Sequence, residues 1–270
     1  MASIVTLSEA ISATVADGHT VALEGFTHLI PFAAGHEVIR QGRTDLRLIR
    51  MTPDLIYDQM IGMGCAAGLV FSWGGNPGVG SLHRLRDAVE NDWPKPLELD
   101  EHSHAAMANA WASGASGLPF AVFRGYQGTS LTDVNRNTAT VTCPFTEETL
   151  AAVPSHRPDV GIVHAQRADR HGNVLVEGIV GVQKEVVLAS AASVVTVEEI
   201  VEDLAPPSMN SVVIPGWTID FVAEVPRGAH PSYVHGYYNR DNSFYVEWDA
   251  VSRDRDRFLT WMDEHVMSAS

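Results

Sequence analysis

The stretch that decides the fold is VALEGFTHLIP, Val21–Pro31. It begins with three consecutive apolar residues and continues into Glu24 and Gly25. A short apolar run that ends at a glycine is typical of a buried strand in an α/β protein, with the glycine in the turn that follows. In open parallel sheets, ligands bind in the loops after the carboxyl ends of the strands. The stretch therefore predicts a buried strand and a candidate substrate-binding loop at Gly25, Phe26 and Thr27.

Predicted helices and strands alternate along the rest of the chain. The helices are expected near residues 7–15, 33–41, 55–62, 82–90, 105–111 and 183–192. The strands are expected near residues 45–51, 68–72, 97–100, 121–125, 160–164, 174–177, 194–197, 212–214 and 221–225. We expect Thr6 and Glu9 to form a capping box at the first helix. The polar residues 127–153 are expected to be irregular or hairpin-like.

This alternation predicts an α/β fold with an open, largely parallel sheet and helices on both of its faces. We expect a single domain over residues 1–270, with a charged amphipathic helix at about 249–266 near its C-terminal end. The glycine-rich and histidine-rich segments described below follow predicted strands. They are therefore expected to meet at one edge of the sheet.

Composition and charge exclude several classes of function. The 270-residue chain has a net charge of −15 and no basic stripe, so no nucleic-acid partner is expected. No window approaches the ~20 apolar residues of a membrane span, and the start of the chain lacks the pattern of a signal peptide. Cys65 and Cys143 share no CxxC spacing and are interpreted as small buried residues in a reducing compartment. These features predict a cytoplasmic protein without a membrane partner.

The segment WGGNPGVGS, Trp73–Ser81, contains four glycines and a proline ahead of a predicted helix. Glycines let the backbone approach a ligand closely and free amide N–H groups to bind anions. The spacing matches neither a dinucleotide fingerprint nor a phosphate-binding P-loop. The alternative is a tight turn that packs the helix onto the sheet, with Ser81 as its N-cap. The candidate substrate-binding residues here are Gly74, Gly75, Asn76, Gly78 and Ser81.

The segment EHSH, Glu101–His104, is the densest polar cluster beside an apolar helix. Its two histidines lack the further spaced ligand of a known zinc pattern, so no metal is expected. Imidazole suits hydrogen bonding to a substrate carbonyl near neutral pH. The alternative is that Glu101 or Ser103 caps the helix and the histidines are solvated.

Two other segments leave alternatives open. RADRHGNV, Arg167–Val174, reads as a turn between two strands. AHPSYVHGYYNRDNSFY, Ala229–Tyr245, is aromatic and polar, and it could line a cleft or cross to a partner chain. No hydrolase elbow of the GxSxG type is present. The residues alone thus predict an α/β protein with a glycine-lined site that bears histidine.

Several stretches in order along the chain carry a family resemblance. They are DGHTVALEGFTHLIP, ASGASGLPFAVFRGYQG, DVGIVHAQRADRHGNV, VTVEEIVED and GAHPSYVHGYY. Together they resemble the alpha chain of the family I CoA-transferases, along nearly the whole chain. The resemblance implies the open α/β fold of that family, of the NagB/RpiA-like type. It also implies an enzyme that is active only with a companion B (beta) subunit, in an assembly of α2β2 or larger.

The resemblance also implies a ping-pong reaction without a permanently bound cofactor, in which a coenzyme A thioester is a substrate. The nucleophile that attacks the acyl-CoA is a glutamate of the B subunit, in a Ser-Glu-Asn-Gly segment that this chain lacks. Glu24 stands where the family usually has glycine, so it is not expected to be the nucleophile. It is instead expected to hydrogen-bond backbone or to adjust the charge of the pocket.

Further roles follow from the resemblance. His104 stands where relatives carry a glutamine that donates to the substrate carbonyl, and Glu101 and His102 would flank and support it. The loop at residues 74–78 would shape the acyl pocket, and Ser81 would contact a distal carboxylate. The implied reaction moves CoA from succinyl-CoA to a dicarboxylic acid, preferably 3-oxoadipate, in the degradation of aromatic compounds. The alternatives are glutaconate as acceptor, an acyl-CoA hydrolase or decarboxylase, and a purely structural subunit.

Overall fold

Strand β2 (Thr20–Glu24) contains the apolar residues of the opening stretch and lies inside a ten-stranded sheet. The computed structural model describes residues 2–268. The main path of the sheet, in spatial order, is β1 (Ser3–Ile4), β13 (Phe221–Glu224), β11 (Ala192–Val201), β9 (Val160–Asp169), β2, β3 (Leu46–Ile49), β4 (Ala66–Phe71) and β5 (Glu98–Glu101). Neighbours on this path pair in parallel. The predicted open, largely parallel sheet is confirmed.

An antiparallel extension completes this sheet. Strand β10 (Val174–Glu177) pairs antiparallel with β9 and with β12 (Ser211–Ile214). The connection from β9 to β10 is the tight turn predicted for the RADRHGNV segment. Asp169 closes it, because its carboxylate accepts hydrogen bonds from the backbone N–H groups of His171 and Asn173, both at 2.9 Å.

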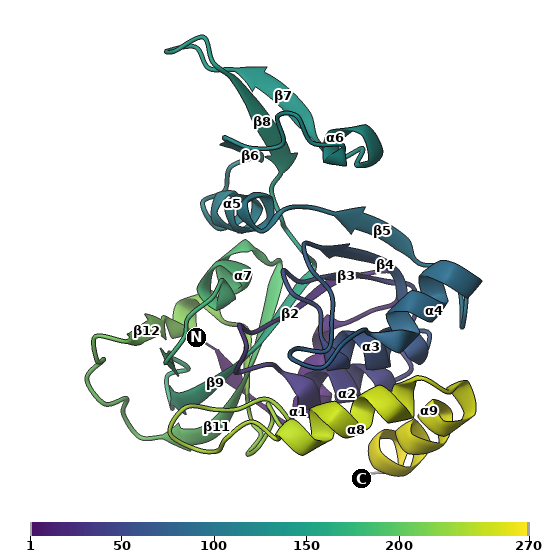
Figure 1. The fold of residues 1–270 in the computed structure, drawn as a ribbon. Coiled ribbons are helices and arrows are strands. Elements are labelled where there is room, and N and C mark those ends of the chain that lie inside the picture. Colours follow the sequence, from purple (N-terminus) through teal and green to yellow (C-terminus); the bar gives the residue numbers. More distant parts are fainter. Residues whose placement is uncertain (1, 269–270) are drawn as a thin grey trace.

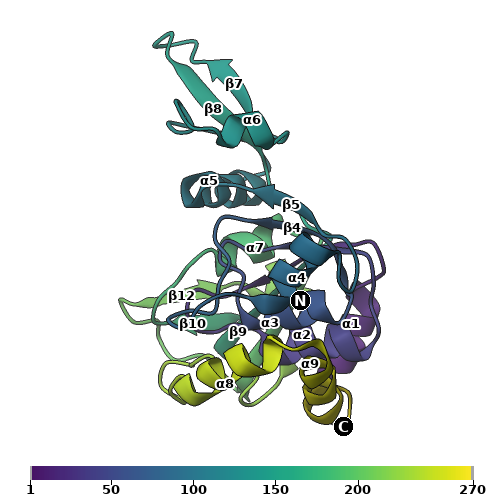
Figure 2. The same ribbon diagram turned by 45° about the vertical axis from the view of Figure 1, so that its right-hand side comes forward.

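Helices cover both faces of the sheet, as predicted (Figures 1 and 2). One face carries α1 (Leu7–Thr14), α2 (Phe32–Arg40) and α3 (Leu55–Gly62), and the other carries α5 (His104–Ala115) and α7 (Gln183–Ala189). Successive residues of a strand point to opposite faces. Val21 and Leu23 accordingly join the core cluster with the first group of helices, while Ala22 joins the cluster that contains Trp111 of α5. Two further helical elements are α4 (His83–Asn91) and the 3-10 turn η1 (Gly216–Thr218). The helices of the arm and of the C-terminal region are described in the following paragraphs.

The capping box predicted at the first helix is present. The Thr6 side chain accepts from the backbone N–H of Glu9 at 3.3 Å, and the Glu9 carboxylate accepts from the backbone N–H of Thr6 at 2.9 Å. These two bonds satisfy N–H groups that have no partner inside the helix. The helix start is thus determined by local sequence.

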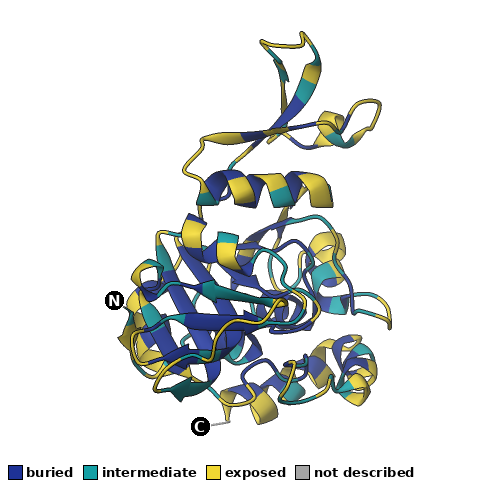
Figure 3. Cartoon of the chain, turned by 90° about the vertical axis from the view of Figure 1, so that its left-hand side faces the viewer, coloured by how far each residue is buried: buried dark blue, intermediate teal, exposed yellow. Residues whose placement is uncertain are grey.

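A small second sheet projects from the body beyond α5 (Figures 1 and 2). It contains β6 (Phe120–Phe123), β8 (Thr149–Pro154) and β7 (Ala139–Thr142) in that order, all antiparallel, with the short helix α6 (Leu131–Val134). We call residues 120–154 the arm. Figure 3 shows most of the arm as exposed or intermediate, whereas central strands of the main sheet such as β2 and β9 are buried. The hairpin-like alternative for the polar segment is therefore the correct one at β7 and β8.

The C-terminal region differs from the single helix expected at about 249–266. It contains α8 (Asn242–Ser252), α9 (Arg255–Met262) and a π-helical turn, η2 (Asp263–Met267). The expected single helix is wrong because Asp254 has extended backbone angles, φ −108° and ψ 132°, and its side chain accepts from the backbone N–H of Arg257. An N-cap inside a charged stretch ends one helix and starts the next. The helical spacing of apolar residues continues across this boundary, so the sequence pattern alone predicts one helix.

Cys65 and Cys143 are both free thiols. Cys65 is buried, and burial raises the pKa of its thiol to about 12. Cys143 lies in the arm and is partly exposed, so the expectation of two buried cysteines holds for Cys65 alone. Within residues 2–268, no helix is both long and apolar enough to cross a membrane.

Candidate functional site

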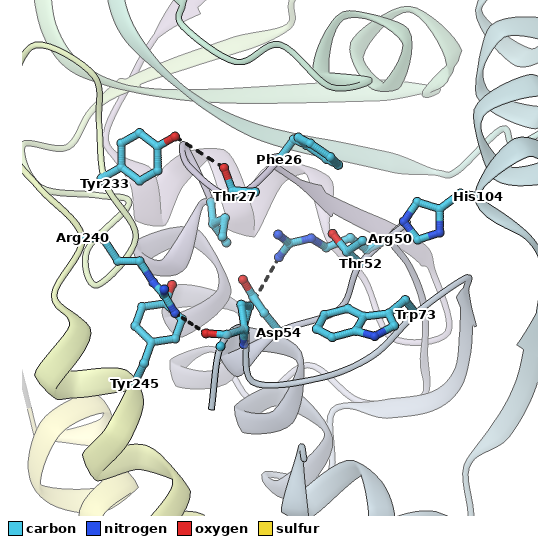
Figure 4. Close-up of a pocket in the computed structure, with 13 residues that line it drawn as sticks. Phe26, Thr27, Arg50, Thr52, Asp54, Trp73, His104, Tyr233, Arg240 and Tyr245 are labelled. Carbon is cyan, nitrogen blue, oxygen red and sulfur yellow. Dashed lines mark hydrogen bonds and ion pairs between the residues drawn. The ribbon is translucent and has the colours of Figure 1, made fainter. Parts of the chain in front are cut away.

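A cavity of about 400 Å³ opens at the carboxyl edge of the main sheet (Figure 4). Its walls come from the loops after β2, β3 and β4, from the first residue of α5, and from the segment that leads into α8 together with the start of that helix. This is the position at which open α/β sheets bind ligands. The lining residues are Phe26, Thr27, Ile30, Arg50, Thr52, Asp54, Trp73, Pro77, Gly78, His104, Tyr233, Arg240 and Tyr245.

The loop after β2 forms one wall, as the opening stretch predicts. Phe26 and Thr27 line the cavity, whereas Gly25, which precedes them in the chain and was predicted with them, is not part of the lining. A Cβ atom on Gly25 would lie 2.5 Å from the carbonyl oxygen of Leu29. Glycine is therefore required at this position by the close approach of two backbone segments. Thr27 adopts a positive φ of 61°, which places it in a sharp turn.

Glu24 does not line the cavity. Its side chain is 1% exposed, and its oxygens accept from the backbone N–H groups of Gly25 at 3.3 Å and Met51 at 3.4 Å. Burial raises the pKa of its carboxyl to about 7, although Arg50 acts in the opposite direction. Of the two roles left open by the sequence, backbone hydrogen bonding is the one that these contacts support. Glu24 ties the end of β2 to the end of β3.

Arg50 connects Glu24 to the cavity wall. Its Nη1 lies 2.9 Å from Asp54 Oδ1, its Nη2 donates to the carbonyl oxygen of Gly25 at 2.9 Å, and its Nε lies 3.9 Å from Glu24 Oε1. Burial raises the pKa of Asp54. Arg50 Nε and Asp54 Oδ2 are both buried without a hydrogen-bond partner. Both residues belong to the cavity wall, but these two atoms are buried within it rather than exposed to the cavity.

The sequence reasoning missed Arg50, Thr52 and Asp54. A signal was present, since these residues directly follow the predicted strand at 45–51 and the carboxyl-end rule applies to every strand of a parallel sheet. The rule itself does not rank one strand end above another, and glycine-rich or histidine-rich composition is what singles a segment out. The segment after this strand contains one arginine and one aspartate, which is an ordinary composition for a loop. Its sequence therefore does not mark it as a binding segment.

The glycine-rich loop contributes part of the second wall. Gly78 lines the cavity together with Trp73 and Pro77. Asn76 is buried, and its Nδ2 donates to the carbonyl oxygen of Tyr245 at 2.7 Å, which fixes the loop against α8. The structure places Gly74, Gly75, Asn76 and Ser81 outside the cavity lining, so these four predicted substrate contacts are not supported. The residue that precedes α4 as its N-cap is Leu82, so Ser81 does not have the capping role that was its alternative.

The four residues of the EHSH segment lie in different environments. His104 is exposed, begins α5 and lines the cavity. Ser103 caps the helix, because its Oγ accepts from the backbone N–H of Ala106 at 3.1 Å. Glu101 is exposed, and it lies outside the cavity lining. The capping alternative is therefore confirmed for Ser103, while His104 is the member of the segment that faces the cavity.

His102 points into a separate buried cluster between β5 and the arm. Its Nε2 lies 3.0 Å from Asp100 Oδ1, and its Nδ1 lies 3.2 Å from the hydroxyl of Tyr126. Burial alone would raise the pKa of Asp100, but hydrogen bonds from His102 and Asn137 and the charge of Arg47 hold it at about 2. His102 is 5% exposed. These contacts support a role in attaching the arm to the body.

The aromatic segment at 229–245 supplies the third wall. Tyr233, Arg240 and Tyr245 line the cavity, so the cleft alternative for this segment is supported. The Arg240 guanidinium lies over the ring of Tyr245, 3.8 Å from its centroid, and donates to the carbonyl oxygen of Pro77. These residues were missed individually because aromatic and polar loops occur at protein interfaces as often as in clefts.

The lining combines cationic groups, N–H donors and aromatic surface. Asp54 is its only carboxylate among the described residues, and it is paired with Arg50. Such an arrangement can hold an anionic ligand and polarise a carbonyl group. Within residues 2–268, no group of three or more His, Cys, Asp or Glu side chains is arranged to hold a metal ion.

Comparison with known sequences identifies the class of protein. The sequence pattern of the family described as Coenzyme A transferase matches residues 4–225. The chain therefore belongs to the Coenzyme A transferase family. It is 64% identical to the A subunit of 3-oxoadipate CoA-transferase from Pseudomonas knackmussii over 266 residues, which cover 98% of this chain and 94% of that protein.

Solved structures agree with this family and fold. Glutaconate coenzyme A-transferase from Acidaminococcus fermentans superposes with a TM-score of 0.92 at 32% identity, over 99% of this chain and 89% of the other. The decarboxylase AibA/AibB superposes with a TM-score of 0.82 at 28% identity, over 97% and 98% of the two chains. The predicted α/β CoA-transferase fold is confirmed.

Proposed function

We propose that this chain is the alpha chain of a heteromeric CoA-transferase that moves CoA from succinyl-CoA to 3-oxoadipate. The observation that carries the proposal is the 64% identity to the corresponding chain of 3-oxoadipate CoA-transferase, over 98% of this chain. The cavity supports it, because its cationic groups and N–H donors suit a small acid and its thioester.

The covalent step belongs to a companion B subunit. Its glutamate attacks the thioester carbonyl carbon of succinyl-CoA, the C–S bond breaks, and an acyl-glutamyl anhydride and CoA thiolate form. The thiolate then attacks the glutamyl carbonyl, which releases succinate and leaves a glutamyl-CoA thioester. The carboxylate of 3-oxoadipate attacks this thioester and the same steps run in reverse. Each intermediate stays activated, so the free energy of the thioester is kept.

The role of this chain is to position and polarise the acyl group. His104 faces the cavity from the first turn of α5, where its ring N–H can donate to the thioester carbonyl oxygen. Trp73 lines the cavity with 45% of its surface exposed, and it offers an apolar wall to the acyl chain. Asp54 is held by Arg50, and Glu24 is buried outside the cavity, so neither is proposed as the nucleophile.

The remaining elements of the proposal concern ligands and assembly. The coenzyme A thioester is a substrate, and no permanently bound cofactor is required by the chemistry above. The companion is a B subunit, and the assembly is α2β2 or larger. We place the enzyme in the cytoplasm, in a pathway that degrades aromatic compounds.

The test is to produce this chain with the B-subunit homologue of its source and to measure 3-oxoadipyl-CoA formation from succinyl-CoA. The expected result is turnover that requires both chains. His104→Ala should lower kcat by about 10²-fold or more, whereas His104→Gln, which keeps an N–H donor, should retain most of it. Full turnover of His104→Ala would remove His104 from the site, and absence of transfer to 3-oxoadipate would reject the proposed acceptor.

Two alternatives have specific support. Glutaconate as acceptor is supported by 33% identity to the corresponding chain of the glutaconate enzyme over 98% of this chain. A decarboxylase is supported by the likeness to AibA/AibB, and a hydrolase by 26% identity to the cholesterol ring-cleaving hydrolase IpdA subunit over 89% of this chain. The same assay separates them: glutaconate would be the faster acceptor in the first case, and free CoA or carbon dioxide would appear without an acceptor in the second.

A further inference from the structure

We propose that the Arg240 guanidinium binds the carboxylate at the far end of the acyl chain and so selects dicarboxylic acids. This inference rests on the proposed CoA transfer and identifies the residue that recognises its substrate class. Arg240 lies two residues before α8, on the opposite side of the cavity from His104, with Asp54 and Trp73 between them (Figure 4). An acyl group polarised at His104 would therefore extend toward Arg240.

The position of Arg240 is fixed by its neighbours. Its guanidinium lies over the ring of Tyr245 at 3.8 Å from the centroid, and one N–H donates to the carbonyl oxygen of Pro77. Arginine has five N–H donors in a planar arrangement. The stacking contact uses the face of that plane and leaves donors along its edge. A preorganised edge of this kind matches the two oxygens of a carboxylate.

Arg240 has no ion-pair partner of its own. Among residues 2–268, no carboxylate oxygen lies within 4.0 Å of its nitrogens, and Asp54, whose pKa the charge of Arg240 lowers, is paired instead with Arg50, the other arginine of the lining, at 2.9 Å. The lining thus contains two arginines and one aspartate, a formal sum of +1, in a chain whose net charge is −15. A site that keeps an unpaired cation in an acidic protein favours an anionic ligand.

Two parts of the substrate could supply the anion: the distal carboxylate of the acyl group and a phosphate of coenzyme A. The observations favour the carboxylate. Arg240 shares one cavity with His104, and the long pantetheine arm separates the phosphates from the thioester, so a phosphate would reach Arg240 only if that arm folded back. The experiment below distinguishes the two.

The test compares 3-oxoadipate with 3-oxohexanoate, which has the same length and 3-oxo group but no distal carboxylate. Both are assayed with the two-subunit enzyme, as wild type, Arg240→Gln and Arg240→Lys. We expect Arg240→Gln to lower kcat/KM for 3-oxoadipate by about 100-fold and to change that for 3-oxohexanoate by less than about 3-fold. Arg240→Lys should recover part of the loss. Arg86→Gln, at an exposed pair with Glu90 on α4, is the matched control and should leave both values unchanged.

Binding measurements keep this inference separate from the proposed function. Calorimetric titration with adipate and hexanoate needs no turnover: wild type should prefer adipate, and Arg240→Gln should lose that preference. If the wild-type enzyme transfers no CoA, the proposed function fails while this titration still decides the role of Arg240. An unchanged preference in Arg240→Gln would overturn the inference. So would a raised inhibition constant for free CoA with an unchanged acid preference, since that result assigns Arg240 to a phosphate.

Discussion

At the scale of single residues, Glu24 makes the stability of the fold depend on pH. Burial raises the pKa of its carboxyl from 4.5 to about 7. Between these values the folded protein binds more protons than the unfolded protein, so the free energy of unfolding falls as the pH rises through this window. The change corresponds to at most about 3 kcal/mol, since one pKa unit is equivalent to ~1.4 kcal/mol. Below pH 4.5 both states are protonated and the effect is absent.

Glu24→Gln should remove this dependence, because glutamine keeps an oxygen acceptor for the N–H groups of Gly25 and Met51 but does not titrate. We expect the unfolding free energy of the wild type, minus that of Glu24→Gln, to decrease by up to about 3 kcal/mol between pH 4.5 and 8. Urea unfolding of both proteins at several pH values measures this difference in unfolding free energy. Glu90→Gln, the same substitution at an exposed position, is the matched control. A flat difference for Glu24→Gln would show that Glu24 does not titrate in this range.

Residue chemistry also sets the limit of what the sequence predicts about the site. Phe26, Thr27, Gly78 and His104 were predicted and line the cavity, because each follows a strand in a segment of unusual composition. Arg240 was not predicted, since its placement depends on a ring at Tyr245 and a carbonyl at Pro77 that are contacted only in the folded chain. Contacts of this kind are set by tertiary packing rather than by local pattern.

At the scale of elements, the boundary between α8 and α9 depends on one side chain. Asp254→Ala should lower the unfolding free energy by about 1 kcal/mol, because the backbone N–H of Arg257 loses its acceptor, now 2.9 Å away. Thermal or urea unfolding measures the change. Asp254→Asn keeps an oxygen acceptor and should stay close to the wild type. Equal destabilisation by alanine and asparagine would assign the effect to charge instead of capping.

The helices and strands themselves were largely predictable, and their ends were not. Apolar runs predicted the central strands of the main sheet because these strands are buried on both faces, as β9 is along most of its length, whereas the exposed edge strand β1 was not predicted. Strand β9 nevertheless extends to Asp169, beyond the predicted end at residue 164, because Arg167 to Asp169 continue the pairing with β11. Polar residues in a strand are stabilised by pairing with residues of the neighbouring strand. The sequence of one segment does not show which residues those partners are, so it does not predict where the strand ends.

At the scale of the whole molecule, the arm and the body have separate cores. The cluster of the arm contains Phe123, Tyr126 and Val153 and meets the body through α5. We expect the amides of β7, an edge strand, to exchange with solvent at least about 100-fold faster than those of β9, in the middle of the main sheet. Hydrogen exchange followed by mass spectrometry tests this. Equal protection of β7 and β9 would show that the arm and the body open as one unit.

The arm also shows which part of the architecture the sequence does not reveal. Its residues are polar and its strands short, so they indicated a hairpin but not a projection from the body (Figure 1). The main sheet was predictable because its strands must be buried and therefore carry a clear apolar signal. A projecting sheet buries few apolar residues, so its sequence carries only a weak apolar pattern. The arm begins just after α5, and the end of that helix sets the direction in which the arm leaves the body.

In the proposed mechanism this chain forms the acyl cavity, and the companion B subunit carries the glutamate that becomes acylated. Intact-mass measurement of both polypeptides, taken during turnover with succinyl-CoA, tests this most directly. We expect the mass increment of bound CoA on the companion and an unchanged mass for the 270-residue chain. A covalent increment on this chain, or thioester exchange by this chain without the companion, would contradict the account.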